Sequence, residues 1–217
     1  MKVRSILAVL AASIASVCSA QIPTGIDLGA CGSLDNHYGP FDFRTASRQQ
    51  IELVESNHLG KGVQSFDVSD RSGRTWEAVG ADLSYTLRVF PNHPRALDLM
   101  SRLAVRHNKP QPPGAQYSME CYFERAARFA ETDPTPLLLQ GVHLARLKQP
   151  REAIKPLTRA SALAPRDANI AYNLGLAYLD SGDTSNALEQ AKIAYSLGFP
   201  LPGLRKRLMD AGVWKEP

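Results

Sequence analysis

Residues 168–198 read ANIAYNLGLAYLDSGDTSNALEQAKIAYSLG, and this stretch decides the fold. Two apolar segments of helical length flank a Ser-Gly-Asp turn at 181–183. Small residues recur where two helices must touch, because close packing needs a small side chain opposite a large one. They are Gly175 in the first segment and Ala187, Ala191 and Ala194 in the second. The stretch therefore predicts a helical hairpin.

The preceding segment repeats this pattern 34 residues earlier. Leu137, Gly141, Leu144, Ala153, Leu157, Ala160 and Pro165 each precede by 34 positions Ala171, Gly175, Tyr178, Ala187, Ala191, Ala194 and Phe199. A single hairpin cannot bury its apolar face alone, so hairpins of this kind stack. The period of 34 is that of the tetratricopeptide repeat (TPR).

Weaker matches continue the pattern upstream. The second-helix positions recur 34 residues earlier at Met119, Phe123 and Ala126, and the first-helix positions recur 40 residues earlier at Leu97, Ser101 and Ala104. The six extra residues lie in the proline-rich loop 108–115, NKPQPPGA, which no helix tolerates. A half-copy is visible at Val79, Leu83, Thr86 and Pro91.

We therefore predict an all-α fold: a short TPR-like superhelical stack of antiparallel helix pairs with an irregular N-terminal segment and a C-terminal capping helix. The alternative is an unrelated helical bundle with chance periodicity. The predicted parts are a signal peptide at 1–20, an irregular segment with one helix at 21–73, degenerate TPR-like helices at 74–133, repeats at 134–167 and 168–201, and a capping helix and tail at 202–217.

The N-terminal segment and the final helix carry further local signals. Within 21–73 we expect the helix at 45–57 and a loop at 59–73. The final helix, 204–211, carries a basic face of Arg205, Lys206 and Arg207. A terminal repeat needs such a polar cap. Contact with anionic lipid is the alternative interpretation of these charges.

The first twenty residues have the pattern of an export signal. Lys2 and Arg4 precede a short apolar run at 5–17, and small residues at 18–20 suit a signal peptidase. The alternatives are a retained anchor and a lipid attached to Cys18, which the preceding valine disfavours. We expect a periplasmic protein, with secretion as the alternative. Removing 1–20 lowers the net charge from +4 to about +2, which does not indicate nucleic-acid binding.

The mature chain keeps two cysteines, Cys31 and Cys121. In an oxidising compartment an even pair predicts one disulfide. Two free thiols are the alternative.

Four segments carry a resemblance to a known group. They are CGSLDNHYGPFDFR at 31–44, FPNHPRAL at 90–97, ECYFERA at 120–126 and GFPLPGLRKRL at 198–208. The chain resembles exported bacterial TPR proteins that combine such segments. The resemblance implies a fold and a compartment, and it implies no activity.

Motifs of catalysis are missing from the sequence. It has no phosphate-binding glycine loop, no nucleophile elbow, and no zinc-type or haem-type cysteine pattern. We therefore expect no enzyme, no cofactor and no metal site. Asp35, His37, Asp42 and Arg44 lie close in sequence. They leave open an enzyme or small-ligand site between 31–44 and the repeats.

The candidate site is a surface formed by the first helix of each repeat. Its predicted partner-binding residues are Arg102, Arg106, Leu138, Val142, Arg146, Tyr172 and Leu176. Apolar positions beside arginines suit a peptide with apolar anchors and an acidic group. We expect an interaction module that scaffolds or escorts another protein or peptide of the cell envelope, with no nucleic acid and no stable membrane insertion after signal cleavage. The alternatives are that these residues are solvated or covered by the N-terminal segment, and that the protein is a structural subunit of an envelope assembly.

Overall fold

The computed structural model describes residues 31–69 and 73–215, and within them the chain is all-helical. The predicted signal peptide and residues 21–30 lie outside the described residues. The helices are α1 (Arg48–His58), α2 (Lys61–Gln64), α3 (Trp76–Val89), α4 (Pro94–His107), α5 (Met119–Phe129), α6 (Pro134–Arg146), α7 (Pro150–Leu163), α8 (Ala168–Ser181), α9 (Thr184–Ser196) and α10 (Gly203–Asp210). None of these helices is long and apolar enough to cross a bilayer.

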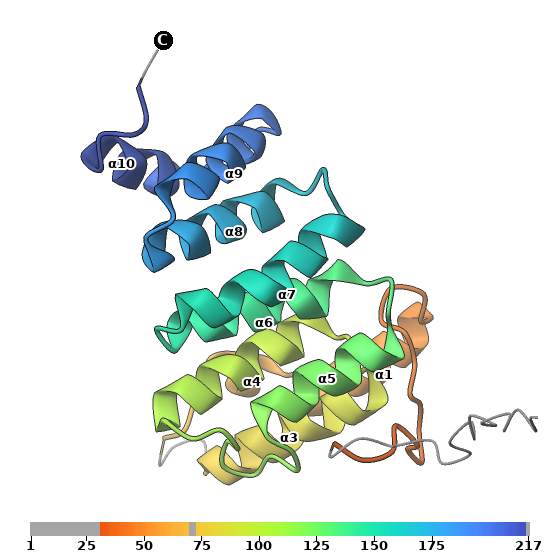
Figure 1. Cartoon of the computed structure of the whole chain (residues 1–217). Helices are drawn as coiled ribbons and strands as arrows, with labels where there is room; N and C mark the ends of the chain where they lie inside the picture. The colour runs from red at the N-terminus through yellow and green to blue at the C-terminus, as the bar shows by residue number, and fades with distance from the viewer. Residues whose placement is uncertain (1–30, 70–72, 216–217) are drawn as a thin grey trace, which may run out of the picture.

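The helices form a stack of pairs that rises from α3 and α4 to α8, α9 and α10 (Figure 1). The pairs α6–α7 and α8–α9 are the two regular hairpins, and α7 packs on α8 to join them. The predicted all-α, TPR-like stack is confirmed. One detail was wrong: the expected loop at 59–73 contains the short helix α2, which Gly60 starts and which buries Val63.

Local sequence signals set the limits of the last hairpin. The Asp167 side chain accepts hydrogen bonds from the backbone N–H groups of Asn169 and Ile170, which caps the start of α8. Gly182 ends α8 with a φ of 92°, a conformation that favours glycine. The next residue, Asp183, caps α9 in the same way as Asp167 caps α8. In the turn at 181–183, Gly182 therefore ends α8 and the next residue, Asp183, caps the start of α9.

The small residues lie where the helices touch, as predicted. A Cβ atom added to Gly141 would lie 2.3 Å from Cγ of Leu157 on the paired helix α7. At the equivalent Gly175 it would lie 2.6 Å from Cδ2 of Leu204, on α10. The equivalent glycine thus makes room for the paired helix in one repeat and for the capping helix in the next.

These two glycines give a matched stability test. We expect Gly141→Ala to lower the free energy of unfolding by about 2 kcal/mol, because the branch carbon of Leu157 cannot move aside cheaply. Gly175→Ala should change it by less than about 1 kcal/mol, because a terminal methyl can rotate away and alanine favours the helix. Urea unfolding of both variants measures the difference, and equal losses would contradict the assignment.

The proline-rich loop between α4 and α5 rests on α3 through two glycines. A Cβ added to Gly80 would lie 1.7 Å from the carbonyl oxygen of Pro113, and one added to Gly114 would lie 1.9 Å from that of Glu77. The backbones of loop and helix therefore meet without side chains between them. Tyr122 supports the contact, since its hydroxyl donates to Oγ of Ser84 on α3.

The N-terminal segment is fastened to α5. Cys31 and Cys121 form the predicted disulfide. The buried guanidinium of Arg125 donates to the carbonyl oxygens of Cys31 and Ser33, and Arg128 donates to that of Gly32. Burial lowers the pKa of Arg125, so these carbonyl contacts matter for the stability of its charged form. At the other end of the stack, α10 buries Leu204 and Leu208, and the predicted capping helix is confirmed.

The disulfide should contribute substantially to stability because it spans 90 residues of sequence. We expect Cys31→Ala combined with Cys121→Ala to lower the free energy of unfolding by about 4 kcal/mol, chiefly by freeing the unfolded chain. Denaturant unfolding of the oxidised protein and of the double variant measures the loss. A difference below about 1 kcal/mol would contradict this account.

Candidate functional site

The predicted partner-binding residues lie on α4, α6 and α8, but they do not form one open groove. At the α4 end, Arg102 and Arg106 are exposed on consecutive turns. The guanidinium carbon of Arg102 lies 5.3 Å from the ring centre of Phe66, and that of Arg106 lies 4.7 Å from the ring centre of Trp76. Aromatic residues from the α2–α3 region therefore lie against both arginines.

The middle of the face is partly buried. Leu138 and Val142 on α6 pack into the core between α6, α7 and α8. Arg146 reaches back to α4, where it donates to Oδ1 of Asp98 at 2.6 Å and to Oγ of Ser101 at 3.0 Å. Its charge is therefore paired within the chain.

The α8 end of the face is covered by the C-terminal cap. The ring of Tyr172 stacks on Phe199 with centres 4.1 Å apart, and both Tyr172 and Leu176 pack against the buried leucines of α10. Burial raises the pKa of Tyr172. The structure thus places Tyr172 and Leu176 beneath the C-terminal cap, in addition to the buried Leu138 and Val142 and the paired Arg146.

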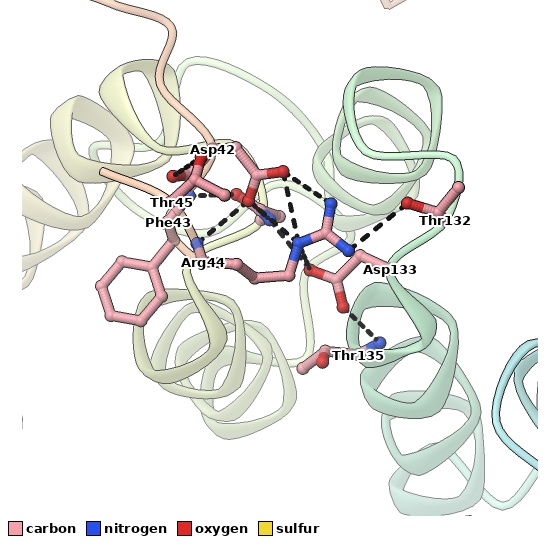
Figure 2. Close-up of polar contacts among 8 residues, drawn as sticks. Asp42, Phe43, Arg44, Thr45, Thr132, Asp133 and Thr135 are labelled. Carbon is pink, nitrogen blue, oxygen red and sulfur yellow. Dashed lines mark hydrogen bonds and ion pairs between the residues drawn. The ribbon is translucent and has the colours of Figure 1, made fainter. Parts of the chain in front are cut away.

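The polar cluster of the N-terminal segment serves to attach that segment to the stack (Figure 2). Asp42 and Arg44 form an ion pair at 2.6 Å. The amide of Asn92, in the α3–α4 turn, donates to Asp42 and to Asp133, the N-cap of α6, at 2.8 Å each. Its oxygen accepts from the backbone N–H of Phe43 at 2.9 Å. The Arg44 guanidinium holds the pKa of the Asp42 carboxyl well below its usual range.

The other two members of the cluster point to no shared site. Asp35 accepts a hydrogen bond from the hydroxyl of Ser33, and His37 is exposed. Across 31–69 and 73–215, no three histidine, cysteine or carboxylate side chains gather as a metal would require.

A cavity of about 420 Å³ lies where α4 ends, α5 begins and α6 passes beside them. This cavity was not predicted from the sequence. Its apolar lining includes Ala104, Pro110, Met119, Phe123, Leu144 and Leu147. Its polar lining includes Lys109, Glu120, Gln140, His143 and Gln149. One feature of the sequence could have indicated this cavity. The first-helix positions of this repeat are offset by 40 residues in place of 34, and the longer α4–α5 loop that causes the offset forms part of the cavity wall.

A chain of hydrogen bonds connects the predicted face to this cavity. Oγ of Ser101 accepts from Nη1 of Arg146 and lies 2.9 Å from Nδ1 of His143. Within the described residues, Nδ1 is the only acceptor found for the Ser101 hydroxyl. The hydroxyl therefore donates to Nδ1, and the proton of the neutral imidazole resides on Nε2.

His143 is neutral at pH 7. Burial, aided by the nearby positive charge of Arg146, lowers its pKa from 6.5 to about 4. His93 is also buried, and its burial lowers its pKa. Its Nε2 lies 3.0 Å from a carboxylate oxygen of Glu55.

Comparison with known proteins adds no relative: no protein-family model matches the chain, and no curated protein does.

The lowered pKa of His143 predicts a loss of stability in acid. As the pH falls from 6.5 to 4, His143 is protonated in the unfolded chain but stays neutral in the folded chain. Proton binding therefore favours the unfolded state, and the free energy of unfolding that is fully present above pH 6.5 falls progressively. Relative to His143→Gln, we expect the wild type to lose about 2 kcal/mol between pH 7 and pH 4.5. Urea unfolding of both proteins at the two pH values measures this. Parallel losses would contradict the assignment, since His93 is common to both.

Proposed function

We propose that the protein is an exported bacterial TPR protein that works as an interaction module, holding a segment of another envelope protein without catalysis of its own. The disulfide supports export, because such bonds persist in oxidising compartments. The signal-like pattern at 1–20 supports the periplasm as the destination.

The observation that carries the proposal is the state of Arg102 and Arg106. Both guanidinium groups are exposed, one turn apart, and each is positioned by an aromatic ring. Within the part of the chain that the structure describes, neither pairs with a carboxylate. Positioned guanidinium groups with unused donors suit a carboxylate, which they bind with two parallel hydrogen bonds. The partner segment therefore presents an acidic side chain or a C-terminal carboxylate to α4.

The test is recovery of a partner after crosslinking in the cells that produce the protein. We expect the variant Arg102→Gln with Arg106→Gln to recover the partner at least ten-fold less than the wild type, since two charge-assisted contacts are lost. The matched control is Arg151→Gln with Lys192→Gln, which removes the same charge from exposed positions on α7 and α9. Equal recovery by both double variants would refute the role of α4.

A further inference from the structure

We infer that the cavity between α4, α5 and α6 is a binding site for a small, uncharged, mainly apolar molecule that carries one hydrogen-bond acceptor, such as a carbonyl oxygen. This site is separate from Arg102 and Arg106, and the inference does not depend on the proposed protein partner.

The size and lining of the cavity suit a small molecule. Its volume of about 420 Å³ falls within the range of small-ligand sites, which are mostly apolar with a few polar groups. Phe123 and Met119 are buried side chains of α5, and Leu144 lies on α6 opposite them. The walls therefore come largely from packed helices, and the α4–α5 loop and the α6–α7 turn form the rest.

The α4–α5 loop is itself held in place. Pro113 and Gly114 meet the backbone of α3 at Gly80 and Glu77. Asn108, Lys109 and Pro110 form the part of the loop that lines the cavity. A preformed wall of this kind lowers the ordering cost of binding.

His143 supplies the hydrogen-bond donor. Its Nδ1 is occupied by Ser101, so the opposite edge of the ring, which carries the Nε2 proton, is the edge available to the cavity that His143 lines. Within the described residues Nε2 has no hydrogen-bond partner, and it is not among the fully buried polar atoms. A neutral N–H group in an apolar wall favours a ligand with an acceptor there, because an apolar ligand would leave that donor unpaired.

The charged residues explain why the ligand is uncharged. Lys109 and Glu120 are exposed, and their opposite charges do not select an ion of either sign. The other polar lining groups are neutral: the amides of Asn108, Gln140 and Gln149 and the imidazole of His143. A buried carboxylate or ammonium would therefore lose its hydration without gaining an unopposed partner of opposite charge.

The experiment uses three probes of one shape with the oxidised mature chain. Acetophenone carries a carbonyl acceptor, ethylbenzene carries none, and benzoate is charged. We expect acetophenone to bind about five-fold more tightly than ethylbenzene, as one hydrogen bond predicts. Benzoate should bind at least ten-fold more weakly than acetophenone. Imidazole nitrogen NMR reads the binding directly, and the Nε2 resonance of His143 should shift with acetophenone and much less with ethylbenzene.

Matched variants locate the site. Leu144→Trp fills the cavity and should abolish the binding of acetophenone, whereas Leu163→Trp, at an exposed position on α7 away from the cavity, should leave it unchanged. His143→Phe keeps a ring of similar size without the donor, and it should no longer bind acetophenone more tightly than ethylbenzene, because the carbonyl oxygen would be left unpaired. If His143→Phe does not fold, the NMR spectrum of the wild type still decides.

Three outcomes would overturn the inference. They are a proton on Nδ1 instead of Nε2, the absence of any His143 shift at saturating acetophenone, and equal binding by the Leu144→Trp and Leu163→Trp variants. None of them bears on the role of α4 in partner binding, because Arg102 and Arg106 are unchanged in every protein used.

Discussion

A helix pair of this stack exposes an apolar face until another element covers it, and the whole structure follows from that constraint. In the middle of the stack the next pair provides the cover. At the ends two unlike solutions are present. At one end α10 inserts Leu204 and Leu208 against α8 and α9. Towards the other, α1 and α2 pack on α3, and residues 31–44 lie beside them, held by the buried Arg125 and by Asn92. Because both covers are part of the chain, the stack is complete with few repeats.

Much of this architecture is predictable because it depends on periodic contacts. The 34-residue offset places Gly141 and Gly175 at helix crossings, and the structure has them there. Once Cys18 is assigned to the predicted signal peptide, the two remaining cysteines leave one pairing, and it forms. The cavity and the donor of His143 were not predictable. The cavity depends on the distance between α6 and the unusually long α4–α5 loop. The donor depends on a contact between Ser101 of one repeat and His143 of the next. The 34-residue period predicts neither feature.

The predicted partner-binding residues lie on α4, α6 and α8, but they do not form one open face. Helical spacing places Tyr172 and Leu176 on the same face as Leu138, but spacing does not reveal that the chain returns to cover them after Gly198. What remains uncovered lies on α4, where Arg102 and Arg106 rest on aromatic rings. Arg146 connects this region to the cavity. On one side it donates to Asp98 of α4. On the other it donates to Ser101, whose hydroxyl donates to Nδ1 of His143 and so leaves the imidazole proton on Nε2.

The disulfide also divides the chain mechanically. The bond between Cys31 and Cys121 closes a loop that contains α1 to α4, so tension applied along the chain bypasses those helices through the sulfur bridge. Among the residues that the structure describes, only those after Cys121 lengthen under load, by at most roughly 300 Å when fully extended. They form most of α5 and the regular hairpins. A protein anchored at its N-terminal end and pulled at the other would therefore yield in its repeats while its N-terminal half kept its extension fixed.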